Sequence, residues 1–134
     1  MPDRQTLVIP GYRVQSNGVA FDVGISCKAD LTDDFHEFIY SDDYQSRSVY
    51  VRYVQTSDSA FRTEEGARIG ESWQQIIDRL AGNEIVYSAN DSCVRMPSGW
   101  HACIDLMSVD RELDPKARRV LPKNTARVAF YYKQ

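Results

Sequence analysis

The residue types that could do chemistry are concentrated between Ser92 and Asp105, in the stretch SCVRMPSGWHACID. Cys93, Cys103, His101 and Asp105 are the types found in a cysteine nucleophile with its imidazole base and carboxylate. However, alternation along a strand also places such residues on one face, and a catalytic cysteine must be free. The enzyme interpretation therefore depends on whether the two thiols are bonded to each other.

The same stretch has the pattern of a β-hairpin with a three-residue loop. Pro97, Ser98 and Gly99 fit a type I turn followed by a left-handed glycine. In that register Cys93 lies opposite Cys103 at a Cβ separation of about 4.5–5.5 Å, near the range that a disulfide bridges. We therefore predict a Cys93–Cys103 disulfide, which implies an oxidising compartment. The alternative is two unpaired thiols in a cytosolic protein.

The predicted register also divides the side chains of the hairpin between two faces. The apolar set is expected to face the core: Val94, Met96, Trp100, Ala102, Ile104 and Leu106. The other set is expected to face water: Cys93, Arg95, His101, Cys103 and Asp105. The tip and its flanks form the predicted partner-binding site: Arg95, Pro97, Ser98, Gly99, Trp100, His101 and Asp105. The alternative is that Trp100 covers the core and the tip is only a turn.

Other turn and strand signals indicate the elements that position this hairpin. Asn17-Gly18 favours a two-residue type I′ turn, and the alternation from Val19 to Cys27 predicts a half-buried strand with Cys27 on its core face. Further strands are expected at 48–56, 84–90, 92–96, 100–109 and 125–133. The segments 84–90 and 92–96 are either two strands or one strand bent near Asn90-Asp91. In the last strand one face is expected to carry Ala126, Val128, Phe130 and Tyr132.

The strongest helix signal covers residues 71–83. Ser72 followed by Gln75 makes a capping box, and Gly82 is a typical left-handed helix terminator. One buried stripe is expected: Trp73, Ile76, Ile77 and Leu80. Shorter helices are predicted at 31–40 and at 114–121, the second with Asp114 as cap and Pro115 at the first helical position.

This order of elements predicts an α+β protein, a single domain over residues 1–134 with an antiparallel sheet and one or more helices packed on one face. The composition, 43% hydrophobic and 26% charged, is ordinary for a globular chain. No apolar run approaches the ~20 residues of a membrane span, so we expect none. The opening residues MPDRQTLVIP lack a long apolar stretch, so we expect no secretory signal within the printed sequence.

The net charge of −3 is unevenly distributed. Residues 30–43 carry six acids and no Lys or Arg, whereas residues 111–133 carry seven basic residues against two acids. The acidic segment is either an ordinary solvated surface or a docking patch for a basic protein. The basic segment lacks any nucleic-acid-binding signature in an acidic chain, so no nucleic-acid partner is expected.

No catalytic or metal-binding signature appears in the sequence. The acid pairs at 33–34 and 42–43 are adjacent, so their side chains diverge, and they lack the spacing of a calcium loop. Zinc, phosphate-loop and C-x-x-C motifs are also missing from the sequence. We therefore expect no catalytic residue, no metal and no cofactor.

The segment TEEGARIGESWQQIIDRLAG, residues 63–82, resembles the turn–helix unit of small exported bacterial proteins with the β-lactamase-inhibitor-like fold. The matching positions are Gly66, Gly70, Ser72, Ile76 and Gly82. That family usually carries the unit in tandem, whereas this chain has one copy. The resemblance implies a periplasmic or secreted, non-catalytic module such as a toxin-immunity protein. It transfers no functional residue, because the shared positions are turn and cap positions.

These observations lead to three functional hypotheses. The first is an exported inhibitor or immunity protein that neutralises a toxin enzyme by docking its stiff hairpin loop in the active-site cleft. The second is a structural component of an envelope assembly. The third is a small-molecule-binding or hydrolytic α+β domain, which requires a pocket lined by aromatic residues such as Phe35, Phe38, Tyr50 and Tyr53.

Overall fold

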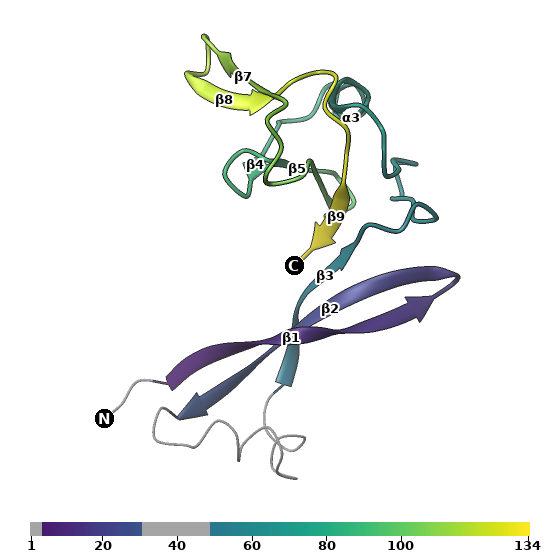
Figure 1. The fold of residues 1–134 in the computed structure, drawn as a ribbon, viewed down its shortest axis with the longest axis vertical. Coiled ribbons are helices and arrows are strands. Elements are labelled where there is room, and N and C mark those ends of the chain that lie inside the picture. The colour runs from purple at the N-terminus through teal and green to yellow at the C-terminus, as the bar shows by residue number, and fades with distance from the viewer. Residues whose placement is uncertain (1–3, 31–48) are drawn as a thin grey trace.

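The computed structural model describes residues 4–30 and 49–134, with side chains described for 12–25 and 51–134. Its main feature is a seven-stranded antiparallel sheet with the strand order β1-β2-β3-β9-β6-β5-β4 (Figure 1). The strands of this sheet are β1 (Arg4–Ser16), β2 (Val19–Asp30), β3 (Val49–Thr56), β4 (Tyr87–Ser88), β5 (Cys93–Arg95), β6 (His101–Cys103) and β9 (Phe130–Lys133).

Strands β1 and β2 form a long twisted ribbon, and β3 connects it to the remaining strands (Figure 1). The predicted turn at Asn17-Gly18 is confirmed, because both residues have positive φ, 53° and 80°, and Ser16 pairs with Val19. The strands predicted near 19–28 and 48–56 are also confirmed. Only Val54–Thr56 of β3 pairs with β9. This short stretch of pairing joins β1, β2 and β3 to the other half of the sheet, β9, β6, β5 and β4.

Helix α3 (Trp73–Arg79) confirms the strongest helix signal, although it is shorter than the predicted 71–83. The capping box is present: the Ser72 N–H donates to Gln75 Oε1 at 2.8 Å, and the Gln75 N–H donates to Ser72 Oγ at 3.3 Å. Trp73 and Ile76 are buried, and Gly82 has a φ of 85° after the helix ends. Local sequence thus determined this element.

The helix predicted at 114–121 was wrong. Strands β7 (Arg111–Asp114) and β8 (Arg119–Pro122) form a two-stranded hairpin there. Asp114 Oδ1 accepts from the N–H groups of Lys116 and Ala117, and Arg118 has a φ of 54°. An Asp-Pro pair begins a β-turn as readily as a helix, and the segment lacks an apolar stripe that would favour the helix.

The predicted α+β class was also wrong, because the structure is mainly β. Within residues 4–30 and 49–134, α3 is the only α-helix. The helix predicted at 31–40 lies outside the described residues. In residues 4–30 and 49–134 the structure therefore has one short helix and the hairpin β7–β8, not the expected layer of helices over one face of the sheet (Figure 1).

Two further strand predictions are resolved by the structure. Strand is present in both segments, and Tyr87–Ser88 and Cys93–Arg95 are separate paired strands, since residues 89–91 all adopt positive φ in a tight turn. Only His101–Cys103 of the predicted strand 100–109 is paired, since the chain turns after Asp105, with the Ser108 N–H bonded to the Asp105 carbonyl at 2.9 Å.

The hydrophobic core lies under the β4-β5-β6-β9 half of the sheet. Among the described side chains its buried members are Phe61, Ala67, Trp73, Ile76, Leu80, Val94, Met96, Ala102, Ile104, Ala126, Val128 and Tyr131. The face predicted for 125–133 changes within the segment, because Tyr131, not Phe130 or Tyr132, continues the buried series. Leu106, predicted to face the core, is 56% exposed because it follows the turn that ends β6.

Candidate functional site

The predicted hairpin and its disulfide are present. Cys93 pairs with Cys103 in register and is bonded to it. The Met96 N–H donates to the Trp100 carbonyl at 2.7 Å, which closes the three-residue loop. Gly99 has a φ of 92°, the left-handed conformation that the loop pattern required. Hereafter the finger denotes residues 93–103.

The exposure predicted for the finger was wrong in one respect. Both cysteines are fully buried, whereas the register placed them on a face toward water. Register decides which side chains share a face, but neighbouring strands and loops decide whether that face is covered. Because both sulfurs are in the disulfide, neither is a free nucleophile.

The tip of the finger is attached to the loop that precedes α3. The Ser98 N–H donates to Glu65 Oε2 at 2.7 Å, and the Ser98 hydroxyl donates to Glu65 Oε1 at 2.8 Å. Burial, the largest single influence, raises the pKa of Glu65, but the hydrogen bonds from Ser98 and nearby groups together lower it below its usual value. Ser98 therefore faces Glu65 and is only partly accessible.

Trp100 covers the edge of the core. Its ring centroid lies 4.7 Å from that of Phe61 and 6.3 Å from that of Phe21, which belongs to β2. Lys133 Nζ lies 5.8 Å from the Trp100 ring centroid. The tryptophan thus joins the finger to the first ribbon and leaves only part of its surface for a partner.

His101 belongs to a polar network on the sheet face opposite the core. Its Nδ1 is 2.9 Å from Ser88 Oγ, and Ser88 Oγ accepts from the Tyr132 hydroxyl at 2.8 Å. The His101 and Tyr132 rings stack with their centroids 4.4 Å apart. Burial first, and the charge of Arg95 second, lower the pKa of His101, so the imidazole is neutral at pH 7. No described carboxylate hydrogen-bonds to this imidazole.

Asp105 is separated from the other predicted site residues. It lies beyond β6, at the end of the finger opposite the tip, and its Oδ1 accepts from the Met107 N–H at 2.9 Å. The structure therefore does not assemble Cys103, His101 and Asp105 into one constellation. The sequence suggested this constellation because alternation along a strand places every second side chain on the same face.

Arg95 and Pro97 remain exposed on the flank of the finger. They line a concavity of ≈ 310 Å³ together with Leu80, Asn83, Glu84, Val86 and Met96. The Arg95 N–H donates to the Val86 carbonyl at 2.9 Å, which holds the finger against the segment after α3. We call this concavity the finger flank. Two residues of the predicted partner-binding site, Arg95 and Pro97, are accessible to a partner there.

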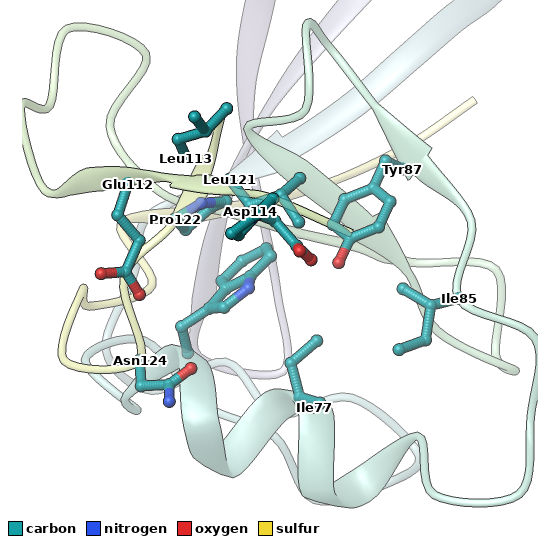
Figure 2. A pocket seen from close by; sticks show the side chains of 11 residues that line it. Ile77, Ile85, Tyr87, Glu112, Leu113, Asp114, Leu121, Pro122 and Asn124 are labelled. Carbon is teal, nitrogen blue, oxygen red and sulfur yellow. The ribbon is translucent and has the colours of Figure 1, made fainter. Parts of the chain in front are cut away.

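Two other hollows were missed by sequence reasoning. One, of ≈ 350 Å³, lies between α3 and the β7–β8 hairpin and is lined by residues including Trp73, Tyr87 and Asp114 (Figure 2). The other, of ≈ 490 Å³, is lined by residues including Tyr132 and Leu106. Only the tertiary arrangement brings their walls together, since each is built from segments far apart in sequence. Of the aromatic residues expected to line a pocket, Tyr53 lines neither of these hollows. The side chains of Phe35, Phe38 and Tyr50 lie outside the described residues.

Residues 31–43 of the acidic segment and the side chains of Asp30 and Cys27 lie outside the described part of the molecule. Across the described residues there is no group of three or more His, Cys, Asp or Glu side chains that could hold a metal ion. No helix in the same ranges is long and apolar enough to cross a membrane. The buried disulfide is compatible with a location outside the cytoplasm.

Comparison with known proteins found no match: no family model, no curated protein and no solved structure matches this chain. The resemblance of residues 63–82 to the β-lactamase-inhibitor-like unit thus stays a prediction.

Proposed function

We propose that this protein is an exported, non-catalytic binding module of the inhibitor or immunity type, which neutralises a partner enzyme by docking the finger flank against it. The observation that carries this proposal is the set of contacts that hold the finger in place. The disulfide joins its strands, Glu65 binds its tip, and Trp100 packs into an aromatic cluster. A preorganised loop loses little conformational entropy on binding, which favours affinity.

The residues that contact the partner in this proposal are those left exposed. Arg95 and Pro97 present a cationic and an apolar group beside the exposed Val86. Arginine is enriched at binding hot spots because it combines charge, several donors and an apolar stem. Ser98 and Trp100 act by holding the tip in place, and they do not enter the cleft of the partner.

The test is site-specific photo-crosslinking in the envelope and secreted fractions of the source cells. A photoreactive amino acid at position 97 is expected to capture one protein, and the same group at position 52 on β3 is the control. Arg95→Glu should weaken that capture at least about tenfold, as for a hot-spot arginine. Arg52→Glu, a matched reversal at another exposed arginine, should leave it unchanged.

The captured protein is then assayed as an enzyme with and without added module. Inhibition that Arg95→Glu relieves supports the proposal. Capture from position 52 alone, or inhibition unaffected by Arg95→Glu, contradicts docking through the finger flank.

A second candidate function, a component of a structural assembly, is favoured by one specific feature. The loop after β6 exposes three apolar side chains, Leu106 at 56%, Met107 at 87% and Val109 at 89%. Grouped exposed apolar residues commonly mark association surfaces. Reversible self-association in sedimentation velocity, lost in a Met107→Ser, Val109→Ser double variant, would favour this function over the first.

A further inference from the structure

The hollow between α3 and the β7–β8 hairpin has the dimensions of a ligand site. Its volume is ≈ 350 Å³, within the usual range of about 300–1,000 Å³ for small-ligand pockets. Much of its wall is apolar: Trp73, Ile77, Ile85, Leu121 and Pro122. Figure 2 shows Ile77 and Ile85 on one side and Leu121 and Pro122 across from them.

The indole N–H of Trp73 lacks a hydrogen-bond partner among the described residues. Trp73 is only 2% exposed, yet it lines this pocket. A buried donor without an acceptor is unfavourable, and nearly all such donors in folded proteins are paired with protein, water or ligand. A carbonyl oxygen of a bound molecule would supply the missing acceptor.

Acidic groups line the same pocket. Neither Glu112 nor Asp114 forms a salt bridge with any described residue. One oxygen of Asp114 accepts from the backbone of the following turn, at 2.9 Å from the Lys116 nitrogen, which leaves the second oxygen available. Figure 2 shows the Asp114 carboxylate and the Tyr87 hydroxyl pointing toward one another.

The cation over the Tyr87 ring is paired with an acid that does not line the pocket. Arg119 is paired with Asp91, and its guanidinium lies 4.7 Å from the centroid of the Tyr87 ring. The pocket therefore combines a buried donor that needs an acceptor, an aromatic and aliphatic wall, and carboxylates that favour a cation.

We propose that this pocket binds a basic amino-acid unit, an arginine or lysine residue whose carbonyl accepts from the Trp73 indole and whose cationic group reaches Asp114 and Glu112. The aliphatic stem of such a residue packs against Ile77 and Leu121, because long basic side chains bury their methylene groups readily. The unit could be supplied by a free amino acid or by a polypeptide. This inference is independent of the finger and of the function proposed for it.

The experiment follows the indole N–H resonances of the ¹⁵N-labelled protein by NMR. The chain has two tryptophans, so there are two indole signals, and Trp100→Phe assigns them. The probes are N-acetyl-argininamide, its uncharged isostere N-acetyl-citrullinamide, and free arginine. Asp114→Asn keeps the oxygen that caps the turn but removes the charge, and Asp110→Asn is the matched control outside the pocket.

We expect N-acetyl-argininamide to shift the Trp73 signal saturably and Trp100 little. The citrulline probe and the Asp114→Asn variant should each bind about fivefold more weakly, the effect of one partly exposed charge pair. Equal binding of free arginine identifies a small-molecule source, and binding of the blocked probe alone identifies a polypeptide source. No shift of Trp73 at about 10 mM probe, or equal affinity for the citrulline probe, overturns the proposal.

Discussion

The contact between Glu65 and Ser98 supports a quantitative prediction, because one carboxylate binds the tip of the finger through two hydrogen bonds. The bond from the Ser98 N–H is 2.7 Å long and the bond from its hydroxyl is 2.8 Å long. Glu65→Ala removes both bonds, whereas Ser98→Ala removes only the bond from the hydroxyl. The two substitutions therefore share one interaction, which a double-mutant cycle isolates.

The magnitude follows from the strength of hydrogen bonds to a charged group, about 1.5–3 kcal/mol each when well desolvated. Both residues are only partly buried, so we take a value of about 1 kcal/mol for each bond. Glu65→Ala should then lower the free energy of unfolding by about 2 kcal/mol and Ser98→Ala by about 1 kcal/mol. The double variant should lose about 2 kcal/mol, which gives a coupling energy of about 1 kcal/mol.

The assay is urea unfolding at pH 7 by tryptophan fluorescence, with Glu64→Ala as the control at an exposed neighbouring carboxylate. The hydrogen bonds to Glu65 hold its pKa below the usual 4.5 against the opposing effect of burial. Its stabilisation is therefore present above pH 4.5 and is lost as the pH falls through the lowered pKa. Additive single and double variants, or a Glu65→Ala cost equal to that of Glu64→Ala, would refute the reasoning.

Three other predictions concern the disulfide, His101 and the exposed loop after β6. Replacing Cys93 and Cys103 together by Ala should cost about 3 kcal/mol in urea unfolding, from the loop entropy of a short closed ring, and addition of reductant to that variant should change nothing further. Burial and the charge of Arg95 lower the pKa of His101, so this histidine is protonated at a higher pH in the unfolded chain than in the folded protein. The free energy of unfolding should therefore decrease below about pH 6.5, by at most ~1.4 kcal/mol per pH unit. His101→Gln should flatten that dependence in pH-dependent unfolding, and an unchanged slope would contradict the assignment. Mutation of the exposed loop residue Met107 to Ser should alter thermal stability by less than ~0.5 kcal/mol, and a larger loss would show that the loop is packed.

Local chemistry made several elements predictable from sequence. The Asn17-Gly18 turn, the capping box at Ser72 and the Pro97–Gly99 loop each depend on backbone preferences of adjacent residues. The disulfide was predictable for the same reason, because the loop type determines the register and the register places Cys93 opposite Cys103. Such signals act within a few residues and need little tertiary context.

Where a segment favours two local structures about equally, the sequence alone did not decide between them. Asp114-Pro115 is compatible with a helix start and with a β-turn, and the turn is the form that lets Arg111 pair with Pro122. The switch of the buried face before Tyr131 has a similar origin, because Ala129 donates to the Cys103 carbonyl at 2.7 Å as the chain enters β9. Contacts with distant strands selected one outcome in each case.

The sequence by itself thus determined the turns at Asn17-Gly18 and Pro97–Gly99, the start of α3 and the pairing of Cys93 with Cys103, because neighbouring residues decide these through backbone conformation and register. Tertiary structure alone decided which faces are covered, how Glu65 comes to bind Ser98, and that Trp73 and Asp114 line one pocket. Burial and long-range contact depend on how the strands are ordered in the sheet, and that order involves the free energy of the whole chain.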